Sequence, residues 1–181
     1  MKSVANVGDI TLVLRAAEFA AHKHRDQRRK DRAASPYINH PISLAYVLAN
    51  EAGIEDSVVL SAALLHDTVE DTDTTAAELE STFGSRIAAV VIEVTDDKML
   101  PKRERKQLQV EHAATISANA KLVKLADKIC NLRDMTSAPP ADWTLDRKRE
   151  YFEWAKRVID QLRGVNAILE ALFDAEYARK P

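Results

Sequence analysis

The sequence predicts an all-α protein, a single bundle of about eight to ten helices. Two observations lead to this prediction. The 181 residues include only 4 glycines and 6 prolines, about half of the usual share of roughly 12%. So few turn residues disfavour many short strands joined by hairpins. Apolar residues also recur at helical spacing along most of the chain, and they make up 46% of it, which is enough for a core.

Three helices are expected in the first part of the chain. The first covers residues 10–29 after Asp9, whose carboxylate suits an N-cap. A second helix begins near Pro41, which fits a first turn, and stops at Gly53. The third covers residues 56–66 and is apolar nearly all round. We therefore expect it to be the buried central helix.

The remaining chain predicts further helices. Thr75 and Glu78 form a capping box for a short helix that ends near Gly84. Residues 86–94 are rich in β-branched side chains, yet a helix is expected because a lone strand would have no partner. Four more helices are expected, over residues 101–116, over residues 120–135, after a Thr144 cap and after Gly164.

Composition excludes several classes of protein. Lys and Arg number 26 against 28 Asp and Glu, a net charge of −2, which disfavours nucleic-acid binding. The single cysteine, Cys130, excludes an internal disulfide and a zinc site made of several cysteines. No apolar run approaches the ~18 residues of a membrane span, and residues 1–4 lack the apolar stretch of a signal peptide. We expect a cytoplasmic protein with no membrane, nucleic-acid or obligate protein partner.

His66 and Asp67 end the most apolar helix, and Glu70 and Asp71 follow at once. An imidazole and a carboxylate are costly to place there unless something pairs with them, and a divalent cation can do so. A dense group of acids also repels itself without a cation. A solvated acidic loop after a helix end remains the alternative at this point.

Two other positions could contribute to the same site. Asp127 and Asn131 stack one turn apart on one face of their helix, so both could point into a site or form a solvent-facing stripe. Pro41 places His40 at the N-cap, from which its side chain would project. An ordinary helix-end histidine is equally compatible with this position.

Basic residues form two clusters in this balanced chain. Arg28, Arg29 and Lys30 lie near the end of the first helix, where phosphate binding, solubility or nucleic acid would each explain them. The second cluster is interpreted as a solvated helix face. It comprises Lys98, Lys102, Arg103, Arg105 and Lys106.

The order His40, His66-Asp67, Asp127 resembles the H…HD…D motif of the HD phosphohydrolase superfamily. Residues 37–41, 63–72 and 123–133 resemble the hydrolase domain of the RelA/SpoT alarmone enzymes, and the likeness extends over about residues 16–169. The stand-alone small alarmone hydrolases are the most similar branch. This resemblance implies one HD domain, with a core of about residues 10–170, and hydrolysis without synthesis.

The resemblance also implies roles for individual residues. His40, His66, Asp67 and Asp127 would hold one Mn²⁺, and a mixed nitrogen and oxygen set also suits Zn²⁺ or Fe²⁺. Glu70 and Asp71 would activate and orient the attacking water. Arg29 would lie along the purine base. The other implied substrate-binding residues are Lys30, Lys102, Asn131, Arg147 and Tyr151.

The implied reaction removes the 3′-pyrophosphate of guanosine 3′,5′-bis(diphosphate), ppGpp, or of its pentaphosphate, and leaves GDP or GTP. Two enzymatic alternatives share the HD fold, a hydrolase of the adenine analogue ppApp or its pentaphosphate and an NADPH 2′-phosphatase. A nucleotide-sensing module without activity is the non-enzymatic alternative. Stacking on Arg29 does not distinguish guanine from adenine, so the base remains open.

Overall fold

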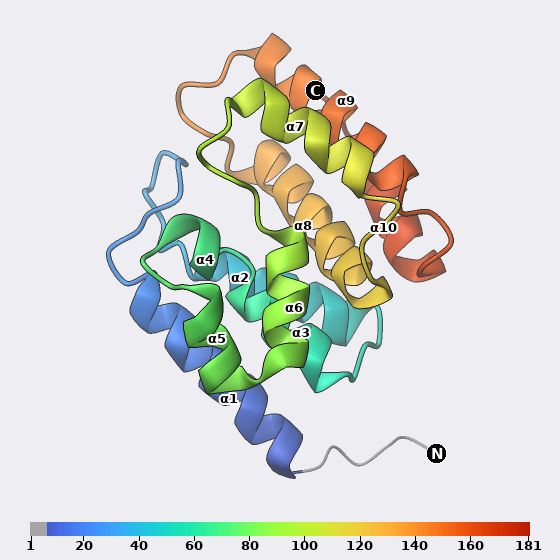
Figure 1. Ribbon diagram of the computed structural model, residues 1–181. Coiled ribbons are helices and arrows are strands. Elements are labelled where there is room, and N and C mark those ends of the chain that lie inside the picture. Colours follow the sequence, from blue (N-terminus) through green and yellow to red (C-terminus); the bar gives the residue numbers. More distant parts are fainter. Residues whose placement is uncertain (1–6) are drawn as a thin grey trace.

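The computed structural model describes residues 7–181, which form an α-helical bundle without a β-strand (Figure 1). The all-α prediction is therefore confirmed. Residues 1–4, on which the expectation about a signal peptide depends, lie outside the described residues. No helix in the described part of the chain is long and apolar enough to cross a membrane.

The helices follow one another with short connections at most positions. In chain order they are α1 (Val7–Lys23), α2 (Asn39–Tyr46), the π-helix η1 (Val47–Glu51), α3 (Ser57–Leu65), α4 (Thr68–Asp71), α5 (Ala76–Phe83), α6 (Ser85–Val94), α7 (Lys102–His112), α8 (Ala118–Ser137), α9 (Leu145–Asp160) and α10 (Ala167–Tyr177). In Figure 1, α1 to α6 form the lower part of the molecule, and α7, α9 and α10 cover α8 in the upper part.

Most predicted helix boundaries are confirmed by their capping contacts. The side chains of Asp56, Thr75 and Thr144 each accept a hydrogen bond from a backbone N–H in the first turn that follows. Gly84 and Gly164 have φ angles of 87° and 92°, in the left-handed region that favours glycine, and each separates two helices. The β-branched segment forms helix α6, as expected.

Four sequence predictions are wrong in detail. Helix α1 begins at Val7, so Asp9 lies within its first turn and is not its N-cap. The first helix ends at Lys23 and does not reach Arg29, because backbone hydrogen bonds such as Arg29 N–H to Ser35 O at 2.8 Å fold the polar segment after it into a loop. Helix α7 ends at His112, before Ile116. The second helix begins at Asn39, so His40 is not its N-cap but lies within the first turn. Helix α4 and the π-helix were not expected.

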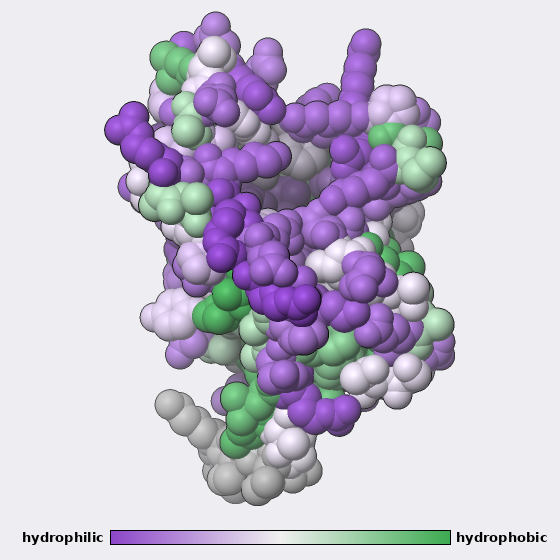
Figure 2. Space-filling view, turned by 90° about the vertical axis from the view of Figure 1, so that its left-hand side faces the viewer, coloured by the Kyte–Doolittle hydropathy of each residue, from purple (hydrophilic) through white to green (hydrophobic). Residues whose placement is uncertain are grey.

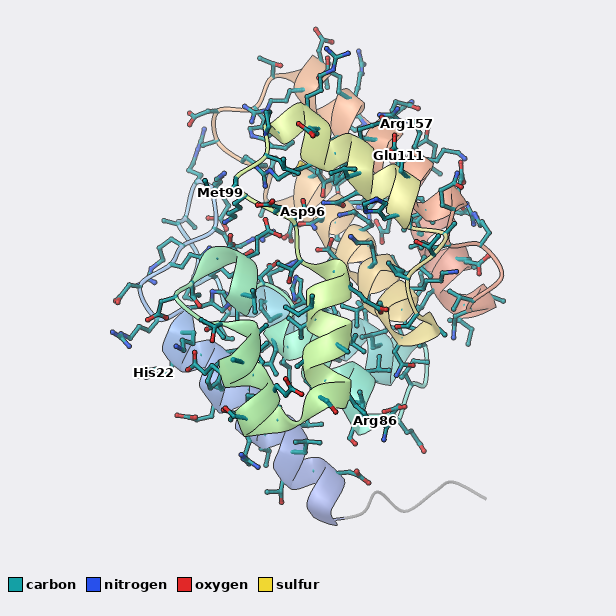
Figure 3. All side chains as sticks on the ribbon, viewed as in Figure 1. His22, Arg86, Asp96, Met99, Glu111 and Arg157 are labelled. Atoms are coloured by element: carbon teal, nitrogen blue, oxygen red, sulfur yellow. The ribbon has the colours of Figure 1, made fainter. Side chains whose placement is uncertain are left out.

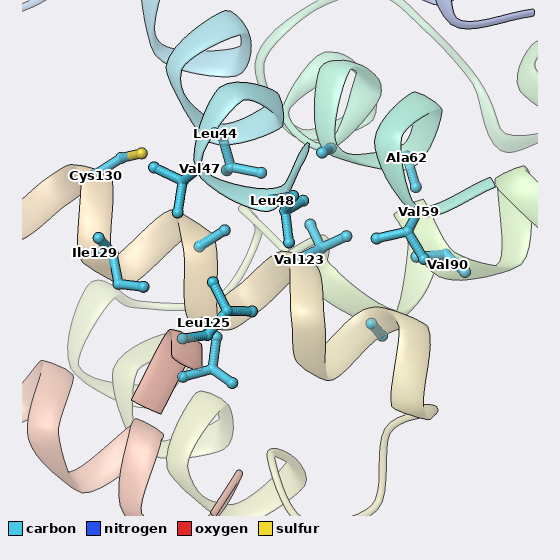
Figure 4. Close-up of a cluster of buried hydrophobic side chains, with 14 of the residues drawn as sticks. Leu44, Val47, Leu48, Val59, Ala62, Val90, Val123, Leu125, Ile129 and Cys130 are labelled. Atoms are coloured by element: carbon cyan, nitrogen blue, oxygen red, sulfur yellow. The ribbon is translucent and has the colours of Figure 1, made fainter. Parts of the chain in front are cut away.

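The core forms where α8 crosses α2, η1, α3 and α6 (Figure 4). Leu44 and Leu48 contact α8 from one side and Val59 of α3 from another, and all are buried. The expectation that the third helix is the buried central one is confirmed, since most of its residues have almost no exposed surface. This packing fixes the start of α2, the end of α3 and the middle of α8 relative to one another.

The Arg133 guanidinium joins three elements. It donates to both carboxylate oxygens of Glu51 in η1, at 2.7 and 2.9 Å, and to Glu176 in α10 at 3.0 Å. We expect Arg133→Met to lower the free energy of unfolding by about 2 kcal/mol, because charged hydrogen bonds are lost, Glu51 remains unpaired and Glu176 retains only Arg179. Urea unfolding measures the change.

Arg163→Met is the matched control, because Arg163 pairs with Asp174 and Asp160 at the surface. Exposed ion pairs contribute at most about 1 kcal/mol, so this variant should lose less stability than Arg133→Met. Equal losses in the two variants would contradict a structural role for the Arg133 contacts.

Candidate active site

Two histidines and two aspartates from three helices converge on one point. His40 Nε2 lies 3.2 Å from Asp127 Oδ1, and His66 Nε2 lies 3.0 Å from Asp67 Oδ2. Across the cluster, His40 Nε2 is 4.0 Å from Asp67 Oδ2 and His66 Nε2 is 3.9 Å from Asp127 Oδ1. The first turn of α2, the end of α3 and the middle of α8 supply these side chains. They line a cavity of about 170 Å³, called the histidine pocket below.

The donors in this cluster suit a divalent cation. His66 Nδ1 hydrogen-bonds the Ala63 carbonyl oxygen at 2.8 Å, which holds the ring so that Nε2 faces the pocket. Buried His66 Nε2 itself has no hydrogen-bond partner. Ligand atoms of His40, His66 and Asp67 lie within 4.8 Å of one another. These residues therefore fit a metal ion, and Asp127 lies close enough to complete the set.

The electrostatics of the cluster also favour a cation. Burial lowers the pKa of the His66 imidazole, but the carboxylates of Asp67 and Asp127 outweigh burial and raise that pKa to about 9. The acids are held by further contacts. Tyr37 Oη donates to Asp67 Oδ2 at 2.5 Å, and Lys128 Nζ donates to Asp127 Oδ2 at 2.9 Å. These two contacts fix the orientation of both carboxylates.

Glu70 and Asp71 face different spaces. Glu70 lines the histidine pocket, where it accepts a hydrogen bond from the Asp96 backbone N–H at 3.1 Å. Burial, helped by nearby carboxylates, raises the pKa of Glu70 to about 7. Asp71 lies on the other side, where Gln27 donates to it at 3.0 Å and Lys98 pairs with it. Glu70 is therefore the acid placed next to the candidate ligands.

A larger hollow of about 620 Å³ adjoins the histidine pocket and is called the outer cleft. The two share Arg29, Tyr37, His40 and Asn131 as wall residues. Figure 2 shows a hollow in this side of the molecule with hydrophilic side chains gathered around it. Basic residues that line the outer cleft are Arg28, Arg29, Lys30 and Lys98. Asp31, Asp71 and Asp134 also line it, so the cleft has a small excess of positive charge, which suits a phosphate-rich ligand.

Arg29 and Asn131 lie where the cleft meets the pocket. The Arg29 guanidinium pairs with Asp134 and lies over the Tyr37 ring, 5.6 Å from its centroid. Asn131 donates to Asp127 Oδ1 at 2.6 Å, and both residues line the histidine pocket. Lys30 lines the cleft with an exposed side chain.

The remaining predicted substrate-binding residues, Lys102, Arg147 and Tyr151, surround the Trp143 ring. The Arg147 guanidinium lies 4.3 Å and the Lys102 ammonium 5.8 Å from the centroid of this ring, and Tyr151 packs against it at 5.7 Å. Trp143 and Tyr151 line the outer cleft. The structure thus brings every predicted site residue to the histidine pocket, the outer cleft or its rim.

The interpretation of the second basic cluster as a solvated surface holds for Lys98, Lys102 and Arg103, which are exposed, but not for Arg105 and Lys106, which are half-buried. Lys98 pairs with Asp71, Arg105 lies 3.6 Å from Glu70, and Lys106 stacks on Trp154 at 4.6 Å from the ring centroid. Arg105 and Lys106 turn inward, toward the Glu70 carboxylate and the Trp154 ring.

Sequence reasoning missed several residues of this site. Tyr37 and Lys128 orient the ligand carboxylates, and Asp134 and Trp143 hold Arg29 and Arg147. Tyr37 and Lys128 lie close in sequence to His40 and Asp127, and this proximity could have identified them as parts of the site. The positions of Asp134 and Trp143 depend on tertiary packing.

Comparisons with known proteins agree on one kind of relative. The HD domain family model matches residues 16–153. The guanosine-3′,5′-bis(diphosphate) 3′-pyrophosphohydrolase MESH1 of Homo sapiens is 61% identical over 158 residues, which cover 87% of this chain and 88% of the relative. Its namesake from Xenopus tropicalis is 57% identical over 166 residues, with 92% and 93% covered.

A solved structure gives the same result. It is described as a metazoan orthologue of SpoT that hydrolyses ppGpp and plays a role in starvation responses. It aligns with a TM-score of 0.91 at 48% identity, covering 98% of this chain and 97% of that chain. The range matched by the family model includes every residue that lines the histidine pocket.

Proposed function

Because the chain belongs to the HD domain family and to its small alarmone hydrolases, we propose that it hydrolyses ppGpp to GDP and pyrophosphate, and the pentaphosphate to GTP and pyrophosphate. Relatives that carry this activity in their names are 57% and 61% identical over most of the chain. The observation that carries the proposal is the pairing of the two-histidine, two-aspartate cluster with a cationic cleft beside it. Residues of about 10–170 would act as one catalytic domain.

The side chains of the histidine pocket indicate which ion the site would hold. His40, His66, Asp67 and Asp127 would hold one divalent ion, which we propose to be Mn²⁺. When bound, such an ion polarises a phosphoryl oxygen and lowers the pKa of water. Asp67 and Asp127 balance its charge, while Tyr37 and Lys128 keep both carboxylates in place.

The chain's own residues would position and activate the reactants. Glu70 takes a proton from the attacking water, because its carboxylate lines the same pocket as the candidate ligands and its pKa is raised to about 7. Asp71 holds Lys98 toward the outer cleft. The ribose and base occupy the outer cleft, and the remaining phosphates meet Lys30, Lys102, Asn131, Arg147 and Tyr151.

Parallel assays test this proposal against its alternatives. Purified protein with Mn²⁺ should release pyrophosphate from ppGpp with kcat/KM at least tenfold above that for ppApp, and above that for phosphate release from NADPH. A preference for either alternative substrate would replace the proposed one. No turnover of all three would favour a nucleotide-sensing module. The cytoplasmic location expected from the sequence stays a prediction.

Arg29 is expected to set affinity for the base. Its guanidinium already has Tyr37 on one face and Asp134 at its edge, so it is held as a flat platform on which a purine could stack. Arg29→Ala should raise KM about ten- to thirtyfold with little change in kcat, since a cation–π contact of ~1–2 kcal/mol is made equally in the ground and transition states. Steady-state kinetics measure both constants.

Arg29→Lys should recover little of this affinity because an ammonium lacks a flat face. Arg28→Ala is the control, since the Arg28 side chain is exposed and bonds backbone carbonyls. A loss that is equal in Arg28→Ala and Arg29→Ala and vanishes at high salt would indicate general attraction of phosphate and would rule out stacking.

A further inference from the structure

Lys124 is a buried lysine that the mechanism above does not use. It lies on α8, one turn before Asp127, and only 7% of its surface is exposed. The helix around it is apolar, and neighbouring Val123 and Leu125 have no exposed surface. A charge in such surroundings is costly without a partner. Something must therefore stabilise the charge of this buried lysine beside the candidate active site.

The other basic residues that line the histidine pocket are already paired. Lys128 binds Asp127, and Arg29 binds Asp134. Within residues 7–181, by contrast, the Lys124 ammonium has no carboxylate oxygen within 4.0 Å and no hydrogen bond. The acids near it have other donors, since Asp96 accepts from Gln109 at 2.6 Å and Glu70 from the Asp96 N–H at 3.1 Å.

The cavities around Lys124 indicate where its partner would come from. A rear cavity of about 210 Å³ adjoins the histidine pocket, and the two share Asp96, Gln109 and Lys124. The residues shared with the outer cleft are different ones, among them Arg29 and Asn131. The histidine pocket, which contains the candidate metal ligands, thus lies between the outer cleft and the rear cavity, and Lys124 lines it on the side of the rear cavity. Figure 3 shows Asp96 in the segment between α6 and α7, close to the centre of the view.

From this arrangement we infer that the Lys124 ammonium contacts the pyrophosphoryl group of the substrate and of the pyrophosphate product. The inference rests on the proposed function. With the nucleoside in the outer cleft and the reacting phosphorus at the ligand cluster, the rest of the 3′-diphosphate extends inward to Lys124. An anionic phosphate gives the ammonium the partner that it lacks. Because burial lowers the pKa of Lys124 to about 8, this anion would also keep the lysine charged.

The chemical step balances around this contact. The water oxygen forms a new bond to the inner phosphorus of the 3′-diphosphate, and the bond from that phosphorus to the ribose O3′ breaks. The electron pair stays on O3′, which takes up a proton, and the proton lost by water goes to Glu70. Lys124 faces the non-bridging oxygens of the group that is transferred.

Two neutral variants, Lys124→Met and Lys124→Gln, test the contact. Both should retain the metal and the wild-type melting temperature, because they remove a buried charge that has no protein partner. Their kcat/KM on ppGpp should fall about ten- to hundredfold, because the contact with the pyrophosphoryl group is made in the bound substrate as well as in the transition state. With Mn²⁺ in excess over pyrophosphate, the inhibition constant for pyrophosphate should rise about tenfold and that for GDP should stay unchanged. Lys121→Met, on the same helix, should behave as wild type.

Each contrary result has a distinct meaning. If kcat/KM of both variants stays within threefold of wild type, or if GDP and pyrophosphate inhibition weaken equally, the contact with pyrophosphate is refuted. If melting temperature and metal content fall together with kcat, Lys124 is structural and the inference is wrong. Wild-type protein that releases no pyrophosphate from ppGpp would overturn the proposed function, and the inference with it.

Discussion

Removal of divalent metal is expected to abolish hydrolysis completely, and Mn²⁺ is expected to restore it best. Four side chains that are buried or nearly so place the Nε2 atoms of His40 and His66 each within 4.0 Å of a carboxylate oxygen of Asp67 and of Asp127. Without a metal ion, the site has no Lewis acid that could polarise a phosphoryl oxygen. Rates after dialysis against EDTA, followed by titration with Mn²⁺, Zn²⁺ and Fe²⁺, measure the dependence.

Substitution of single ligands should have the same effect. His66→Ala and Asp67→Ala should each lose both bound metal and activity, since three ligands remain and, for Asp67, the charge is no longer balanced. His22→Ala is the control, because His22 is exposed and contacts Arg25 away from the pocket. Figure 3 shows His22 at the edge of the molecule. Turnover at the wild-type rate in excess EDTA would refute metal dependence, and retained metal in His66→Ala would exclude that residue as a ligand.

The helical fold could be predicted because its signals are local. Capping side chains at Asp56, Thr75 and Thr144 and left-handed glycines at Gly84 and Gly164 act within one turn, so they can be read from neighbouring residues. The loop after α1 could not be predicted in this way. Its course depends on hydrogen bonds between residues of the loop and on the contact of Gln27 with Asp71, which is distant in sequence.

The candidate site was predicted from the order of His40, His66, Asp67 and Asp127 along the chain, which resembles a family motif. The number of residues between them did not indicate that they meet. Nothing local indicates that His40, His66 and Asp127 meet, because they come from three helices whose relative positions are fixed by packing around α8. The resemblance to a family supplied that information. Lys124 had no such signal, because a lysine in an amphipathic pattern is normally solvated. Only the packing of α6, α7 and the loop between them against α8 makes it a buried charge.

Glu70→Gln is expected to keep the metal and to lose kcat by about 10²–10⁴-fold, the usual contribution of a general base. Glutamine has the same shape and can still contact the Asp96 N–H, so the pocket should stay intact. Elemental analysis and initial rates measure the two properties separately. Asp71→Asn should also retain the metal and lose turnover about a hundredfold. The cause would differ, because Asp71 binds Gln27 and Lys98 at the outer cleft and does not face the metal ligands.

The pH profile distinguishes the two acids. Burial raises the pKa of Glu70 to about 7, and a divalent ion beside it would lower that value. Because a base must be deprotonated to accept a proton, wild-type kcat should rise with pH through a limb at or below about pH 7. Asp71→Asn should retain this limb, whereas Glu70→Gln should lose it, since the titrating group is gone. A limb that persists in Glu70→Gln, or a loss of metal that parallels the loss of rate, would show that Glu70 is not the proton acceptor.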